Sequence, residues 1–104
     1  MNEYEFLGII AQLQRAMTKG RDSKYYQQQS KRFREACIWK ISTKFNMDED
    51  LADVLAVDML DSFYVRESVS DYHEIMTQIR KGAKKHGYNE EVFPSGTQDL
   101  DLPS

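Results

Sequence analysis

The chain has 104 residues, with 14 Lys and Arg against 17 Asp and Glu, and one cysteine, Cys37. This length suits a single domain, and one cysteine excludes an internal disulfide. No run of about 20 apolar residues is present to span a membrane, and the acidic start at residues 1–5 is unlike the basic start of a secretory signal. We expect a soluble, intracellular protein located in the cytoplasm.

Apolar residues recur at intervals of three and four along most of the chain, which is the period of an amphipathic helix. The pattern predicts an all-α fold, a small four-helix bundle within one domain at residues 1–88. The first helix is expected over residues 3–19, with Gly20 as its C-terminal cap. Its apolar stripe consists of Phe6, Ile9, Ile10, Leu13 and Met17.

A second helix is expected to begin after a cap at Asp22 or Ser23 and to continue to Phe45. Asn46 is suited to end it, because asparagine tolerates the left-handed conformation. At about 22 residues this helix would be about 33 Å long. Its apolar side is expected to contain Tyr26, Phe33, Cys37, Trp39, Ile41 and Phe45.

Asp48 is expected to cap a third helix, which is followed by a break at residues 64–69. A fourth helix is expected to start from a cap at Ser68 or Ser70 and to be ended by Gly87. The apolar positions assigned to the third helix are Leu51, Val54, Leu55, Met59, Leu60 and Phe63, and those of the fourth are Ile75, Met76, Ile79 and Ala83.

Residues 89–104 lose the helical period and carry acidic residues without Lys or Arg, so they are expected to form a flexible acidic tail. Within it, Gln98 to Leu102 (Gln-Asp-Leu-Asp-Leu) resembles the peptides with which bacterial replication proteins dock on the sliding clamp. Such a peptide binds in an extended form through its glutamine amide and two leucines. Pro103 stands where those peptides have an aromatic residue. The alternative is a tail that only keeps the protein soluble.

Charge is divided into blocks. Residues 15–44 carry a net charge of +7 and residues 45–71 a net charge of −7, and these blocks fall on the second and third predicted helices. Packed side by side, the two helices would be complementary, each exposed pair contributing roughly 0–1 kcal/mol. The alternative is that the basic helix binds nucleic acid by neutralising phosphates. The residues assigned to that role are Lys24, Lys31, Arg32 and Arg34.

One stretch resembles part of an enzyme family. Residues Asp50 to Leu55 (Asp-Leu-Ala-Asp-Val-Leu) resemble the second metal motif of the all-α nucleoside triphosphate pyrophosphohydrolases of the MazG type, in which a Glu-x-x-Asp helix faces an earlier Glu-x-x-Glu helix across magnesium. Here the earlier helix offers only Glu35 among Lys31, Arg32 and Arg34, so the first acidic motif is lacking. The sequence has no phosphate-binding Gly-rich loop, nucleophile elbow or zinc spacing either. We expect no enzyme, no catalytic or metal-ligating residue and no cofactor.

Binding to another protein is the function that the sequence favours. Tyrosine, tryptophan and arginine concentrate binding energy at interfaces, and we expect a protein-binding surface that contains Tyr25, Tyr26, Arg32, Trp39 and Tyr64. The alternative is that Tyr26 and Trp39 belong to the core while Tyr25 covers the helix end. The expected role is that of a small adaptor, regulator or inhibitor, with a homodimer as one form. Small acidic chains of this kind occur among viral and mobile-element proteins.

Overall fold

The computed structural model describes residues 1–89, which form four α-helices and no strand. The helices are α1 (Glu3–Met17), α2 (Lys24–Phe45), α3 (Glu49–Arg66) and α4 (Tyr72–Lys85). The predicted all-α, four-helix fold is therefore confirmed. From residue 90 onward, the predicted acidic tail lies outside the described residues. This includes its clamp-like peptide at residues 98–102.

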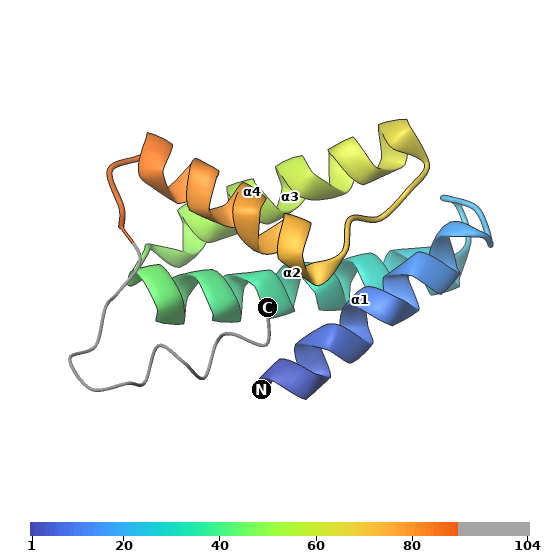
Figure 1. Cartoon of the computed structure of the whole chain (residues 1–104). Coiled ribbons are helices and arrows are strands. Elements are labelled where there is room, and N and C mark those ends of the chain that lie inside the picture. Colours follow the sequence, from blue (N-terminus) through green and yellow to red (C-terminus); the bar gives the residue numbers. More distant parts are fainter. Residues whose placement is uncertain (90–104) are drawn as a thin grey trace.

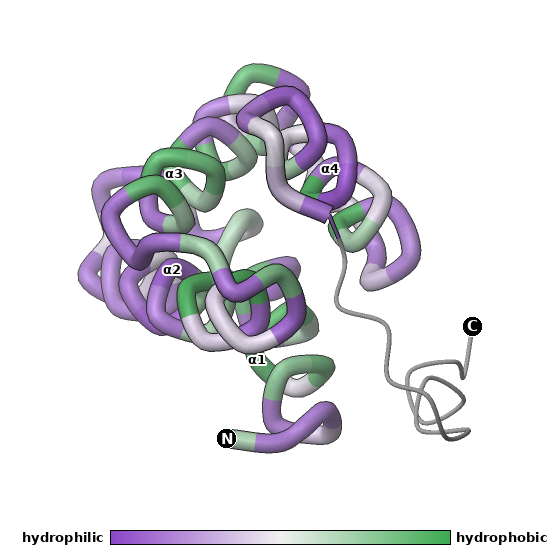
Figure 2. The backbone as a smooth tube through the Cα atoms, turned by 90° about the vertical axis from the view of Figure 1, so that its left-hand side faces the viewer, coloured by the Kyte–Doolittle hydropathy of each residue, from purple (hydrophilic) through white to green (hydrophobic). Residues whose placement is uncertain are grey.

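The helices follow one another around the bundle in chain order (Figures 1 and 2). The long α2 packs against α1 on one side and against α3 on the other, and α4 packs against α3. The outward side of α2 is mostly hydrophilic in Figure 2, as expected of a helix that buries only one face. This arrangement places the basic α2 directly beside the acidic α3.

Aromatic pairs connect neighbouring helices in the core. Phe33 of α2 and Phe63 of α3 meet edge to face, with 5.7 Å between ring centroids. Phe6 of α1 meets Tyr72 of α4 in the same way at 5.8 Å. Edge-to-face pairs of this kind contribute roughly 0.5–1.5 kcal/mol beyond the burial of their area. The two contacts hold α3 on α2 and α4 on α1.

Helix ends follow the predicted caps at several positions. The Ser23 hydroxyl accepts a hydrogen bond of 3.0 Å from the backbone of the first turn of α2, and Asn46 ends that helix in the left-handed conformation at φ 52°. An additional cap, not predicted, starts α1, where the Asn2 and Glu5 side chains each accept a hydrogen bond from the other's backbone. The α1 helix ends at Met17, earlier than predicted.

Two predictions about the region between α3 and α4 are wrong. The third helix does not break at residue 64 but continues to Arg66, and Glu67 ends it in the left-handed conformation at φ 57°. The cap of α4 is Asp71, whose carboxylate accepts a backbone hydrogen bond of 2.9 Å, and not Ser68 or Ser70. The Ser70 hydroxyl is buried and accepts a hydrogen bond of 2.7 Å from Arg66 instead.

The predicted apolar positions are nearly all buried, while Met17, Trp39 and Leu51 are half-buried. Val54 is the exception, because its side chain is 51% exposed. It lies on the outward side of α3, so its predicted place in the core is wrong.

A polar cluster that no sequence pattern indicated connects α1, α2 and α4. Lys40 of α2 is buried, and its Nζ lies 2.6 Å from Oε1 of Glu3. The Tyr72 hydroxyl of α4 donates a 2.6 Å hydrogen bond to Oε2 of the same carboxylate. Burial raises the pKa of Glu3, but the hydrogen bonds from Lys40 and Tyr72 outweigh burial and leave the pKa below its ordinary value. The cluster fixes the first turns of α1 and α4 on the C-terminal half of α2.

Candidate protein-binding surface

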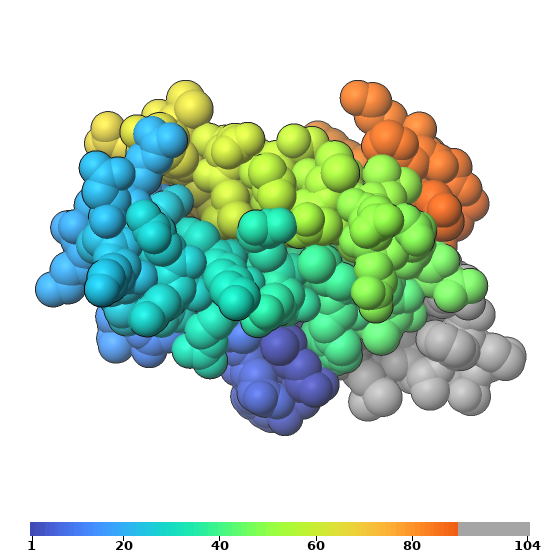
Figure 3. All heavy atoms as spheres, turned by 180° about the vertical axis from the view of Figure 1, so that it is seen from behind, coloured from blue at the N-terminus to red at the C-terminus, as the bar shows by residue number. Residues whose placement is uncertain are grey.

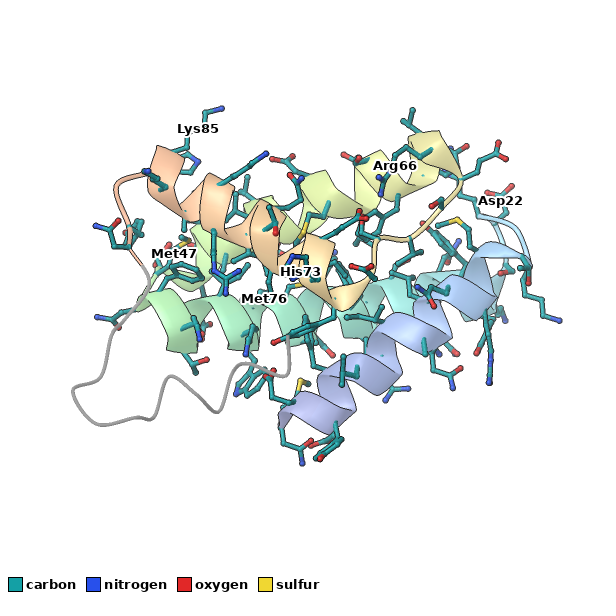
Figure 4. All side chains as sticks on the ribbon, viewed as in Figure 1. Asp22, Met47, Arg66, His73, Met76 and Lys85 are labelled. Carbon is teal, nitrogen blue, oxygen red and sulfur yellow. The ribbon has the colours of Figure 1, made fainter. Side chains whose placement is uncertain are left out.

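One end of the bundle carries a contact between a cation and an aromatic ring. The α1–α2 connection and the C-terminal end of α3 lie beside each other there, in blue and yellow in Figure 3, and Asp22 and Arg66 mark this end in Figure 4. Arg21 of the connection places its guanidinium carbon 3.8 Å from the centroid of the Tyr64 ring. Such stacking is favourable because the ring face carries partial negative charge.

A hollow of about 500 Å³ opens beside this contact. Met17 and Val69, both half-buried, supply its apolar wall, and Arg21 and Tyr64 line it as well. The other residues that line it are Gln14, Thr18, Gly20, Glu67 and Ser68. We call the hollow together with Arg21, Tyr64 and the adjacent Val65 the Arg21–Tyr64 surface.

Local structure explains why these side chains meet. Because α3 continues to Arg66, Tyr64 and Val65 belong to its last turn and not to a loop. Gly20 has φ 93°, a conformation that glycine adopts at little cost, and the chain turns there so that Arg21 reaches the ring. The length of α3 and the turn at Gly20 together form the surface.

The exposed residues of the Arg21–Tyr64 surface suit recognition by a protein. Tyr64 is 39% exposed and Val65 79% exposed. Within residues 1–89, Arg21 stacks on Tyr64 and forms neither an ion pair nor a hydrogen bond with the protein. Its guanidinium N–H groups are therefore available to acceptors on another molecule, in a geometry that matches a carboxylate.

The five residues predicted to bind a protein do not lie on one surface. Tyr26 is buried in the core. Tyr25 is half-buried, and its hydroxyl donates a hydrogen bond to Oε1 of Gln12 on α1. Arg32 is exposed and lines a different hollow, between α1 and α2. Trp39 is half-buried, farther along α2.

Tyr64 is thus the one residue predicted to bind a protein that belongs to the Arg21–Tyr64 surface. Arg21 and Val69 were not singled out, and Met17 was assigned to the apolar stripe of the first helix. Arg21 lies between helices, where hydrophobic periodicity gives no signal. A weak indication in the sequence was Gly20, which predicts a turn directly before the cationic Arg21.

Two basic residues of α2, Arg34 and Lys31, lie beside carboxylates of α3. Arg34 donates two hydrogen bonds to Asp53, of 3.0 Å from Nε and 2.8 Å from Nη2. These hydrogen bonds lower the pKa of Asp53 and raise that of Arg34. Lys31 lines the same hollow as Glu49 and Asp50. The complementarity expected of the two charge blocks is therefore present between α2 and α3.

The Arg34 contact also bears on the resemblance to a metal-dependent enzyme. Asp53 is one of the two acidic residues of that motif, and an arginine occupies both of its carboxylate oxygens. Among residues 1–89, no group of three or more His, Cys, Asp or Glu side chains is arranged to hold a metal ion. Cys37 is buried, and burial raises the pKa of its thiol above the ordinary range.

None of the four described helices is both long enough and apolar enough to cross a membrane. Comparison with known proteins gives no match to a family model, to a curated protein or to a solved structure. Any proposal about function therefore depends on the residues and the geometry of this chain.

Proposed function

We propose that this chain is a non-enzymatic protein-interaction module, a small adaptor, regulator or inhibitor, and that it binds its protein partner through the Arg21–Tyr64 surface. The observation that supports this most is the stack of an exposed arginine on a partly exposed tyrosine beside a hollow with an apolar wall. Tyrosine and arginine next to a pocket are the residues in which interface energy concentrates.

Charges around the surface favour a particular kind of partner. Lys19, Arg21 and Lys24 are exposed in or next to the α1–α2 connection, against Asp22 and Glu67. The partner is expected to offer an apolar side chain to the hollow and a carboxylate to the guanidinium. An acidic protein surface with a protruding apolar residue has this chemistry.

Affinity capture with matched variants tests the proposal. Tagged wild-type protein, Tyr64→Ala, Arg21→Ala and Val54→Ala are incubated with lysate, treated with nuclease and analysed by mass spectrometry. Val54 is the control, since it is an exposed apolar residue of the same helix outside the surface. One protein retained by the wild type and Val54→Ala, and reduced at least tenfold by the other two variants, is expected. Equal capture by all four variants would contradict the proposal.

A second proposal is that the chain binds nucleic acid through α2. Lys24, Lys31 and Arg32 are exposed, and the two lysines lie seven positions apart, on one face of the helix. The test replaces these three residues with Glu and leaves Arg34 unchanged, because a carboxylate at that position would repel Asp53. Recovery of nucleic acid by the wild type and its loss in this triple variant would support the second proposal over the first.

A further inference from the structure

The α1 helix has an outward face that nothing else in residues 1–89 covers. Tyr4, Gly8, Ala11 and Arg15 are all exposed and follow one another at intervals of four, three and four. Such alternation keeps residues on one line along a helix and is the spacing of a helix-pairing seam. Tyr4 is 85% exposed, and Leu7 next to this line is also exposed. The face therefore presents two large exposed side chains, Tyr4 and Leu7, beside the small residues Gly8 and Ala11.

Gly8 gives the face a second feature. It lies inside a helix of 15 residues, where glycine costs roughly 0.5–1 kcal/mol relative to alanine. A Cβ atom at this position would meet no atom of residues 1–89 within 4 Å, so packing among these residues does not require glycine here. Gly82 of α4 differs, because a Cβ there would lie 2.7 Å from Cδ2 of Leu55. Close approach of another molecule's backbone is a setting in which Gly8 would be useful.

The order of residues along the face is self-complementary. Tyr4 and Glu5 lie toward the N-terminus of α1, Arg15 lies toward its C-terminus, and the small residues Gly8 and Ala11 lie between them. In an antiparallel pair, each Arg15 would meet the ring of Tyr4 and the carboxylate of Glu5 from the other copy, while Gly8 faced Ala11. A parallel pair would set Arg15 against Arg15. Opposed helix dipoles favour the antiparallel direction as well.

We propose that α1 binds α1 of a second copy of this chain in an antiparallel, two-fold symmetric contact centred between Gly8 and Ala11. The contact uses different residues from the Arg21–Tyr64 surface and goes beyond the function proposed above. One helix face about 22 Å long is a small interface, so a dissociation constant on the order of 10 µM is expected.

Sedimentation equilibrium of the full chain between about 1 and 500 µM tests this contact. The wild type is expected to pass from monomer to dimer over this range. Gly8→Leu should weaken association at least tenfold, because its side chain would separate the two backbones. Leucine has a higher helix propensity than glycine, so the Gly8→Leu monomer should stay folded. Circular dichroism can verify this. Gln28→Leu adds the same side chain at an exposed position of α2 and should leave association unchanged.

Arg15→Glu tests the direction of pairing. It places carboxylates at both ends of an antiparallel seam and should also weaken association at least tenfold. A wild type that stays monomeric up to 500 µM would overturn the proposal, and so would a dimer that Gly8→Leu leaves intact. A dimer that Arg15→Glu does not weaken would overturn the antiparallel arrangement.

Discussion

The Nζ atom of Lys40 lies 2.6 Å from Oε1 of Glu3, in an ion pair between residues 37 positions apart in the chain. The lysine side chain is 5% exposed and the glutamate side chain 30%, so the cation is enclosed while the anion reaches the surface. Removing one partner from a buried pair costs more than the pair contributes, because the remaining charge has lost water as well. The stability of this bundle should therefore depend on Glu3.

Replacing Glu3 with Gln removes the negative charge and keeps the side-chain shape. Because Lys40 is buried beside it, we expect the free energy of unfolding to fall by about 2 kcal/mol, less than for a fully buried pair since the carboxylate reaches water. Urea denaturation at pH 7 measures this difference. Glu5→Gln is the matched control, because glutamine can still cap α1, and it should change stability by less than ~0.5 kcal/mol.

The contribution of Glu3 should also depend on pH. Its pKa is lower in the folded chain than the ordinary value of about 4.3. A carboxylate with a depressed pKa contributes its full stabilisation at pH values above the ordinary pKa. This stabilisation is lost as pH falls through the folded-state pKa. The difference between wild type and Glu3→Gln should be constant above about pH 5.5 and shrink below about pH 4. A difference that stayed constant down to pH 3 would show that the pair does not titrate in this way.

Arg34 and Asp53 form a pair of another kind, with 44% and 33% of their side chains exposed. Water and salt screen such a pair, so a double-mutant cycle with Arg34→Ala and Asp53→Ala should give a coupling energy of about 0.5 kcal/mol. The coupling should decrease in 1 M NaCl, where the Debye length is about 3 Å. A coupling of zero at low salt would argue against the bidentate contact.

Gln29 of α2 is buried, and its Oε1 atom has no hydrogen-bond partner within the described residues. An unsatisfied buried polar atom costs about 1–3 kcal/mol. Gln29→Met, which has similar volume and no polar oxygen, should raise the free energy of unfolding by about 1 kcal/mol. The neighbouring Gln28→Met is the control, because that side chain is exposed. Destabilisation by Gln29→Met in thermal or urea unfolding would mean that the amide is satisfied.

Cys37 should be unreactive in the folded protein. Its thiol is fully buried, and burial raises the pKa, so almost no thiolate is present at pH 8. An aromatic disulfide reagent is expected to react with Cys37 at the rate of unfolding, and rapidly after addition of denaturant. Immediate reaction of the native protein would contradict the packing around this residue.

Helix positions could be predicted because they depend on local chemistry. Ser23 and Asn46 set the limits of α2 through side-chain capping and the left-handed conformation, both of which are properties of single residues. The end of α3 was misjudged at Tyr64 and Val65, since a stretch rich in β-branched and polar residues looks like a break. The helix continues there, and Arg66 in its last turn donates a hydrogen bond to the Ser70 hydroxyl in the α3–α4 connection.

The candidate binding surface could be predicted only in part. Adjacent residues on a helix point about 100° apart. The sequence pattern placed Tyr26 on the apolar side of α2, yet Tyr26 was also assigned to the binding surface; it is buried in the core. Arg21 lies in the α1–α2 connection and stacks on Tyr64 of α3, which is far from it in the sequence. No pattern within one sequence indicates such a pairing. The cluster of Glu3 with Lys40 could not be predicted for the same reason.

Site-specific photo-crosslinking at Tyr64 tests the central claim most directly. A photoreactive phenylalanine derivative replaces Tyr64 in one sample and Glu49, at the opposite end of α3, in another. Irradiation in lysate after nuclease treatment is expected to yield one covalent adduct with a heterologous protein from position 64 and none from position 49. No adduct at position 64, or the same adducts from both positions, would contradict binding through the Arg21–Tyr64 surface.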